Sequence, residues 1–320
     1  MSGLFGKTLR PAILAASRSH GLQHTAERLA VTRRVVDRFV PGATLDRVLE
    51  STAALRGSGR MISIDYLGEQ VADAGGASAT VNAYLRLLEE LGRRADAAHD
   101  GVRPLEVSLK LSALGQALTR DGERIALWHA HRICERAEQV GAWVTLDAED
   151  HTTTDSTLSI AAQLRTEFPW LGVVVQAYLR RAAGDCEQLA ASGVRVRLCK
   201  GAYDEPASVA HRDPGAVTAA YLRCLRVLMA GPGYPMVASH DPVIIDAVSA
   251  MVRETGRATD DFEYQMLYGV RDSEQRRLAA DGNRVRVYVP FGTQWYGYFM
   301  RRLAERPANL TFLMRALARP

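Results

Sequence analysis

Two adjacent arginines near the C-terminal end of the chain, Arg301 and Arg302, are the residues whose type and spacing most suggest chemistry. They follow Tyr298 by three and four positions, so in a helix these three side chains lie on one face. Neighbouring guanidinium groups present a forked set of donors that suits a carboxylate or a phosphate. An isolated pair of this kind is more often a solvent-exposed basic surface, so its interpretation depends on the elements around it.

The elements that precede this pair alternate between short β-rich runs and helical stretches. The segment 288–309 continues the pattern, with a valine-rich strand that ends at Val289, a turn with proline and glycine, and a helix that stops at Pro307. Alternation of this kind predicts a parallel sheet, and eight units are the number that closes a (βα)8 TIM barrel. The eight predicted strands begin at Ile62, Leu105, Trp143, Gly172, Val194, Pro235, Phe262 and Arg284.

Residues 1–56 form a predicted N-terminal helical arm, ahead of a barrel domain over 57–320. Apolar residues recur in the arm at helical spacing among several arginines. Pro41 and Gly42 interrupt this pattern, and Thr44 is expected to cap a following helix that runs through Leu55. We expect the arm to pack on the barrel; a basic amphipathic surface for a membrane or a partner is the alternative.

Side chains within the predicted strands alternate between apolar and polar, whereas strands buried on both faces are apolar throughout. In the second strand, Leu109 and Leu111 share one face, and Ser108 and Lys110 share the other. We expect the apolar faces to meet the outer helices and the polar faces to line the barrel lumen. Barrel enzymes bind their ligands at the C-terminal ends of the strands. The last lumen-facing residues there are Lys110, Asp147, Gln176, Arg197, Gln265 and Tyr288.

The predicted site carries an excess of positive charge. Lys110, Arg197, Arg301 and Arg302 outnumber the carboxylate of Asp147. A cationic pocket attracts an anionic ligand, and buried charges are costly unless a partner or a ligand neutralises them. For each residue taken alone, a structural ion pair such as Lys110–Asp147 is the alternative explanation.

Two short segments after the fifth and sixth strands also suggest anion binding. The turn Lys200-Gly201-Ala202 offers backbone N–H groups and an ammonium to a phosphate, and Ser239 with His240 adds a hydroxyl and an imidazole. A lysine at a strand end is also the residue that forms a Schiff base in barrel aldolases. The sequence contains no Ser-His-Asp order, HExxH motif, Walker loop or GxGxxG motif.

Composition sets the broad class of protein. A chain of 320 residues with 47% hydrophobic residues can bury a sizeable core, and a net charge of +4 is too small to indicate nucleic-acid binding. The four cysteines show no metal-binding spacing, so we expect reduced thiols, no metal and a cytoplasmic protein. The sequence has no apolar run long enough for a transmembrane helix. A peripheral contact with the inner face of the membrane stays open.

Seven segments along the chain carry a family resemblance. In order they are SLKLSALG, LDAEDH, QAYL, RLCKGAY, ASHD, QMLYG and VYVPFGTQWYGYFMRRLAERPAN. They resemble the motifs of the proline dehydrogenase family, and above all its monofunctional bacterial enzymes, over roughly residues 60–310. The resemblance implies a distorted (βα)8 barrel that holds FAD, with the last helix over the barrel mouth. It also implies oxidation of L-proline to Δ1-pyrroline-5-carboxylate, with the electrons passed to a membrane quinone.

The resemblance also implies roles for individual residues, carried over motif by motif. Asp147 and Arg197 match the residues treated as catalytic in the family, and the arginine would lie near the flavin N5. Cys199 stands where valine is common in the family, Ser239 replaces threonine, and Thr293-Gln294 occupies an often acidic spot. Substrate-binding positions match Lys110, Arg301, Arg302, Tyr288, Tyr298 and Leu267. Flavin-contacting positions match Ala148, Gln176, Arg197, Lys200, Gly201, Ala202, Ser239 and His240.

These roles suggest a mechanism in which proline lies between the flavin and the last helix. Lys110, Arg301 and Arg302 would clamp its carboxylate and place C5 over N5 for hydride transfer, while Asp147 would orient Lys110 by ion pairing. Three alternatives stay open: a hydroxyproline dehydrogenase, a flavin-free barrel that forms a Schiff base or binds phosphate, and a non-catalytic binding module. The second step, to glutamate, would fall to a separate pyrroline-5-carboxylate dehydrogenase.

Overall fold

Eight parallel strands close into a barrel in sequential order, as the sequence predicts. The computed structural model describes residues 36, 38–68, 71–94 and 101–305, and of 301–305 the backbone alone. Every strand pairs with its two chain neighbours, and β1 closes the ring on β8. The strands are β1 (Met61–Tyr66), β2 (Leu105–Leu109), β3 (Trp143–Leu146), β4 (Gly172–Gln176), β5 (Arg195–Cys199), β6 (Tyr234–Ala238), β7 (Glu263–Leu267) and β8 (Val285–Phe291).

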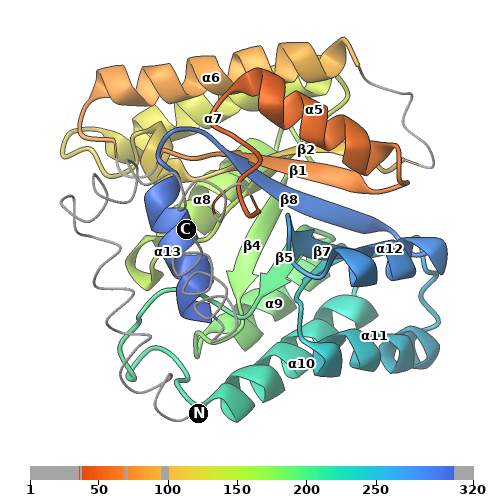
Figure 1. Cartoon of the computed structure of the whole chain (residues 1–320). Helices are drawn as coiled ribbons and strands as arrows, with labels where there is room; N and C mark the ends of the chain where they lie inside the picture. The colour runs from red at the N-terminus through yellow and green to blue at the C-terminus, as the bar shows by residue number, and fades with distance from the viewer. Residues whose placement is uncertain (1–35, 37, 69–70, 95–100, 306–320) are drawn as a thin grey trace, which may run out of the picture.

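Helices follow the strands and surround the barrel (Figure 1). Asp73, Asp213 and Asp241 each accept a backbone N–H at the start of a helix, which satisfies donors that the first turn leaves unpaired. The helices of the described chain are α5 (Leu45–Arg56), α6 (Ala74–Gly92), η2 (Leu111–Leu114), α7 (Gly122–Gln139), η3 (His151–Thr153), α8 (Thr154–Arg165), α9 (Ala182–Ala191), α10 (Pro214–Ala230), α11 (Pro242–Thr255), α12 (Asp272–Ala280) and α13 (Trp295–Glu305).

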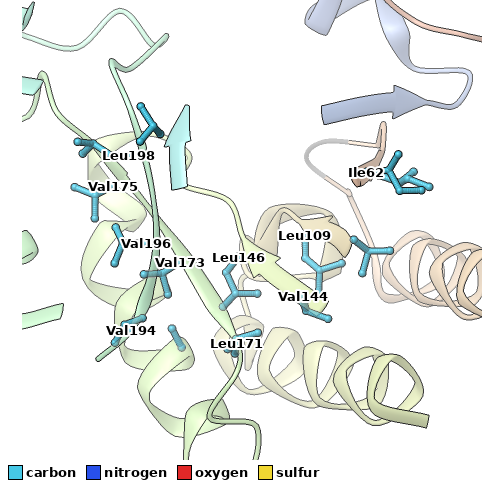
Figure 2. Close-up of a cluster of buried hydrophobic side chains, with 14 of the residues drawn as sticks. Ile62, Leu109, Val144, Leu146, Leu171, Val173, Val175, Val194, Val196 and Leu198 are labelled. Atoms are coloured by element: carbon cyan, nitrogen blue, oxygen red, sulfur yellow. The ribbon is translucent and has the colours of Figure 1, made fainter. Parts of the chain in front are cut away.

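The outward face of the strands forms the main hydrophobic core. Leu146 of β3 lies beside Val173 of β4 in this layer, as Figure 2 shows, and Val144 and Val175 belong to the same core. These are the residues that the alternation pattern assigns to the outer face, and all are buried. Because full burial of one such side chain is worth about 1.5–3 kcal/mol, this layer holds the helices on the barrel and fixes which strand residues point inward.

Helix α5, the last part of the predicted N-terminal arm, packs on the outside of β1 and β8. Val48, Leu49 and Leu55 are buried in the same core as the strands. Thr44 lies at the N-cap as expected, but its side chain makes no capping hydrogen bond. The helix starts instead from the backbone, where the N–H of Val48 bonds to the Thr44 carbonyl. Residues 1–35 of the arm lie outside the described residues.

Helix α13 lies at the barrel end where β8 terminates (Figure 1). Tyr298 and Phe299 pack with Phe39, Val40 and Leu67 in a second hydrophobic cluster, separate from the main core. Leu67 directly follows β1, so this cluster seats α13 against the C-terminal end of the barrel. The helix was expected to stop at Pro307; its described part ends at Glu305.

We propose that α5 belongs to the cooperative unit of the barrel rather than to a separate arm. Leu49→Ala is then expected to lower the free energy of unfolding of the whole protein by about 2–5 kcal/mol, because it removes a buried side chain from the shared core. Urea denaturation followed by circular dichroism measures this. The control is Glu50→Ala, which changes an exposed residue of the same helix. A barrel transition that stays in place for Leu49→Ala would refute the proposal.

Candidate active site

Paired charges fill the lower part of the lumen, near the N-terminal ends of the strands. Arg286 bonds to both oxygens of Glu263 at 2.7 and 3.0 Å, and Arg195 bonds to Glu106 at 2.6 Å. The Arg195 guanidinium also stacks over the ring of Trp143, 3.6 Å from its centroid. These side chains neutralise one another, so the polar lumen at this level is structural.

Arg197 joins this lower layer to the upper one. Its buried guanidinium donates to acceptors on four other strands or their ends, which uses all three nitrogens. Burial alone would lower the pKa of Arg197, but the carboxylates of Glu106 and Asp147 outweigh this effect and raise it. Arg197 is therefore a fixed positive charge at the centre of the lumen. Its acceptors are Ser63 at 3.0 Å, Glu106 at 2.6 Å, Ser108 at 2.7 Å, Asp147 at 2.7 Å and Gln265 at 2.5 Å.

Asp147, just past β3, is held through both of its oxygens. Oδ1 accepts from Arg197, and Oδ2 accepts from the hydroxyl of Tyr288 at 2.8 Å. Burial raises the pKa of Tyr288 well above its ordinary value, and the nearby carboxylates of Asp147 and Asp65 raise it further. Tyr288 thus stays a neutral hydrogen-bond donor. Because both oxygens are engaged, Asp147 is placed as a fixed acceptor rather than as a free base.

Lys110 faces two carboxylates. Its ammonium bonds to Asp65 at 2.5 Å, and the nearest Asp147 oxygen is 3.9 Å away. The expected ion pair with Asp147 is thus present, but it is the longer of the two, and Asp147 is also engaged by Arg197 and Tyr288. The carboxylate at hydrogen-bonding distance from Lys110 belongs to Asp65, which the sequence analysis did not name.

Asp65 is the residue of this site that the sequence analysis missed. It lies on β1, where Ser63 and Asp65 alternate with Ile62 and Ile64. The same alternation that identifies Lys110 on the second strand applies here, and extending it to the first strand would have assigned Asp65 to the lumen.

With Asp65 included, the charges at the centre of the described mouth balance one another. Two cations, Lys110 and Arg197, face two carboxylates, Asp65 and Asp147. The predicted cationic excess therefore depends on Arg301 and Arg302. Their backbone lies in α13, and their side chains lie outside the described residues.

Loop residues beyond the strands tie the rim of the barrel together. Gln176 at the end of β4 donates to the Glu149 carbonyl at 2.7 Å, and the Glu149 carboxylate accepts from the backbone N–H and the hydroxyl of Ser112. The buried carboxylate of Glu205 accepts from the backbone N–H of His151 at 2.9 Å and contacts its imidazole. The loops after β2, β3, β4 and β5 are thus linked. Ala148, the first residue after Asp147, is half-buried on this rim.

The turn after β5 is shaped by Gly201. Its φ of +108° lies in the region that favours glycine, and a Cβ at this position would overlap the ring of Tyr178. The half-buried Ala202 follows. Lys200, expected to offer its ammonium to an anion, instead bonds to Asp241 at 2.6 Å and to Thr218 at 3.0 Å. Any anion at this turn must share or displace those contacts.

The segment after β6 turns His240 toward β7. The His240 Nε2 accepts the backbone N–H of Leu267 at 2.9 Å, so that nitrogen carries no proton in this arrangement. The Ser239 hydroxyl accepts the backbone N–H of Asp241 at 3.1 Å. Tyr298 on α13 is buried in the cluster that also contacts Tyr288. The structure therefore groups Leu267 with His240 and Tyr298 with Tyr288 around one mouth.

A closed (βα)8 barrel with charged side chains at its C-terminal mouth defines the class of α/β-barrel enzymes. The particular family follows from comparison with known proteins. The family model for proline dehydrogenase matches residues 48–315. Proline dehydrogenase 1 of Bacillus subtilis subsp. natto is 38% identical over 309 residues, which is 97% of this chain and 99% of that protein. The proline dehydrogenase of Deinococcus radiodurans is 39% identical over 286 residues, covering 88% of this chain and 90% of that protein. The chain belongs to the proline dehydrogenase family of enzymes.

Solved structures agree on the fold. The crystal structure of proline utilization A from Bdellovibrio bacteriovorus, inactivated by N-propargylglycine, superposes with a TM-score of 0.79 at 25% identity. The match covers 86% of this chain and 33% of that protein, so this chain spans about a third of its length. Within the ranges that the structure describes, no helix combines the length and the apolar character needed to cross a bilayer.

The lumen network predicts a specific dependence of stability on pH. Burial alone would raise the pKa of Glu106, but the guanidiniums of Arg286, Arg197 and Arg195 outweigh it and lower the pKa below its usual range. Ionised Glu106 therefore stabilises the fold above about pH 4.3, the value of a free glutamate. This stabilisation is lost as the pH falls from there toward the lowered pKa of the folded state.

Glu106→Gln should therefore lower the free energy of unfolding by about 3–5 kcal/mol at pH 7, because it leaves buried guanidiniums unpaired. It should also flatten the fall in stability between pH 5 and pH 3. Urea titrations across this pH range measure both effects. The control Glu138→Gln removes an exposed partner of Arg103 and is expected to cost less than about 1 kcal/mol. An acid limb as steep in Glu106→Gln as in the natural protein would contradict the assignment.

Proposed function

We propose that this chain is a flavin-dependent proline dehydrogenase that oxidises L-proline to Δ1-pyrroline-5-carboxylate. The observation that carries the proposal is the constellation under α13. Lys110, Asp147, Arg197 and Tyr288 converge at the C-terminal mouth of the barrel, joined by direct hydrogen bonds or ion pairs. Membership of the proline dehydrogenase family gives this constellation a substrate.

Lys110, Arg301 and Arg302 would bind the carboxylate of proline. Lys110 supports this role because Asp65 holds its ammonium at the mouth, on the side of the barrel where β1 ends and α13 packs. Forked guanidiniums add directional donors that a lysine lacks. The apolar ring of proline would then lie against Tyr288, Tyr298 and Leu267. Tyr298 belongs to the hydrophobic cluster of α13, and Tyr288 packs against that cluster.

The residues on the opposite side of the mouth fit a flavin. Gln176 and Lys200 line this wall with donors that Glu149, Thr218 and Asp241 engage in the structure, and Arg197 adds a fixed positive charge. The turn at Gly201 packs closely against the ring of Tyr178. Ala148, Ala202, Ser239 and His240 complete this wall. When bound, FAD would supply the acceptor, at N5, for a hydride from C5 of proline. The chain's own part is to orient proline and to hold a permanent positive charge, that of Arg197, close by.

Two features bear on the competing functions. A Schiff-base lysine must be able to lose its proton, whereas the ammonium groups of Lys110 and Lys200 each bond to a carboxylate. Both amines are thus held in ion pairs rather than placed for attack on a carbonyl, which argues against an aldolase-like barrel.

We further propose that the electrons pass to a membrane quinone and that a separate pyrroline-5-carboxylate dehydrogenase consumes the product. The enzyme would then work in the cytoplasm, at the membrane surface.

An anaerobic absorbance spectrum tests the proposed function directly. The purified protein should be yellow with a band near 450 nm, and L-proline should bleach this band. Hydroxyproline serves as the comparison substrate, and N-propargylglycine should inactivate the enzyme irreversibly. A colourless protein favours the flavin-free barrel, and a yellow protein that proline does not bleach favours a non-catalytic module. Either result would refute the proposal.

The carboxylate assignment predicts the behaviour of Arg302→Lys. This change keeps the charge but loses the forked geometry, so KM for proline should rise at least about tenfold, equal to about 1.4 kcal/mol of binding free energy. The flavin content should stay near that of the natural protein. Steady-state kinetics and the ratio of flavin to protein absorbance measure the two quantities. Arg276→Lys, on the exposed face of α12, is the matched control. Loss of FAD with unchanged proline affinity would overturn the assignment.

A further inference from the structure

Asp65 has contacts unlike those of the other buried acids in the barrel. It lies on β1, opposite Ser108 of β2 and Pro290 of β8, and is completely buried. One oxygen, Oδ2, accepts from the Lys110 ammonium at 2.5 Å. Among the described residues, the other oxygen, Oδ1, has no hydrogen-bond partner.

The acids of the lumen floor make the comparison clear. Glu106 engages both oxygens, one with Arg197 and one with Arg195. Glu263 likewise receives Arg286 on both oxygens. A buried carboxylate that serves only to stabilise the fold is expected to satisfy its acceptors in this way. Asp65 does not, so structural pairing alone is a poor explanation of its position.

The other titratable groups that face Asp65 are engaged with different partners. Tyr84 of α6 donates its hydroxyl to the Ser108 carbonyl at 2.6 Å, and Tyr288 of β8 donates to Asp147 at 2.8 Å. Asp147 itself, past β3, is a second negative charge. Burial raises the pKa of Asp65, Lys110 lowers it, Asp147 raises it again, and the Tyr288 hydroxyl lowers it. The Lys110 ammonium is the larger of the two influences that favour the ionised form of Asp65.

Asp65 in turn affects the protonation of Lys110. A lysine at a buried position tends to lose its proton, because burial disfavours the charged form. Lys110 is buried at the end of β2, and Asp147, whose charge Arg197 already neutralises, is 3.9 Å from it. A carboxylate at 2.5 Å both fixes the position of the Lys110 nitrogen and opposes the loss of its proton.

We propose that Asp65 is a positioning residue for substrate binding: it holds the Lys110 ammonium at the barrel mouth and keeps it charged, without itself touching the substrate. This inference rests on the proposed function, in which Lys110 binds the carboxylate of proline. One part of the inference, that Asp65 controls the charge of Lys110, can be tested without measuring catalysis.

The composition of the chain makes that test practical, since its lysines are Lys7, Lys110 and Lys200 and no others. Protein labelled with 13C at the lysine ε carbon should therefore give three NMR signals, which Lys110→Met and Lys200→Met assign. In the natural holoenzyme the Lys110 signal should titrate above about pH 10.4, the value of free lysine. In Asp65→Asn the midpoint should fall by at least about one pH unit, and in Asp65→Glu it should stay high.

The matched control is Glu263→Gln, which breaks a buried ion pair at the other end of the lumen. It is expected to lower stability and leave the Lys110 titration unchanged. An unchanged Lys110 midpoint in Asp65→Asn would overturn the proposal. So would a midpoint below about pH 10.4 in the natural protein, a result that needs no variant to fold.

Kinetics then connect this charge to the substrate. Asp65→Asn should raise KM for proline at pH 9 in proportion to the fraction of Lys110 that has lost its proton, and progressively less at lower pH, while kcat at saturation changes less than about threefold. In the Lys110→Met background the same substitution should leave KM unaltered, because the group through which Asp65 acts is gone. Additive effects on KM would overturn the positioning role. If the Lys110 titration shifts as expected but proline never bleaches the flavin, the proposed function fails and the control of Lys110 by Asp65 stands.

Discussion

The requirement that every charge inside the barrel have a counter-charge governs this structure. Strands with one polar face can form a closed barrel only if the lumen side chains neutralise one another, because an unpaired buried ion costs several kcal/mol. Arg197 meets this requirement for two levels at once, bonding to Glu106 below and Asp147 above. The geometry of the candidate site is consequently continuous with the network that stabilises the barrel. A change at Glu106 is therefore expected to reach Asp147 at the mouth through Arg197.

Two helices, α5 and α13, lie at different places around the barrel, and their placement leaves α13 over the proposed ligand-binding end. In a regular barrel the helix after the last strand packs outside β8 and β1. Here α5 takes that place, with Leu49 and Leu55 in the main core. Helix α13 instead lies at the C-terminal end of the barrel, where Tyr298 and Phe299 pack in a separate hydrophobic cluster. That separate cluster is small, so α13 covers the mouth without being part of the main core.

The alternation of side chains along each strand explains how much of the fold and the candidate site was predictable from the sequence. The alternation of side chains with period two identifies both the eight strands and the lumen face, and it brings Asp147, Arg197 and Tyr288 together correctly. This alternation predicts which face of the strand a residue occupies, but not which side chain across the lumen it contacts. Lys110 was therefore paired with the more distant of its two carboxylates, and the partner of Lys200 was not foreseen. Those contacts depend on strand stagger and loop path, which the sequence pattern does not encode.

The two ends of the lumen also differ in how fully their acids are satisfied. At the floor, Glu263 and Glu106 engage both carboxylate oxygens. At the mouth, Asp65 engages one. Stability alone would favour replacing such an acid with a neutral residue, so its presence indicates a requirement of another kind. Sites that bind charged ligands retain groups that the fold by itself does not favour. The under-satisfied carboxylate therefore sets the mouth apart from the floor, in agreement with the proposal that the ligand binds at this level of the barrel.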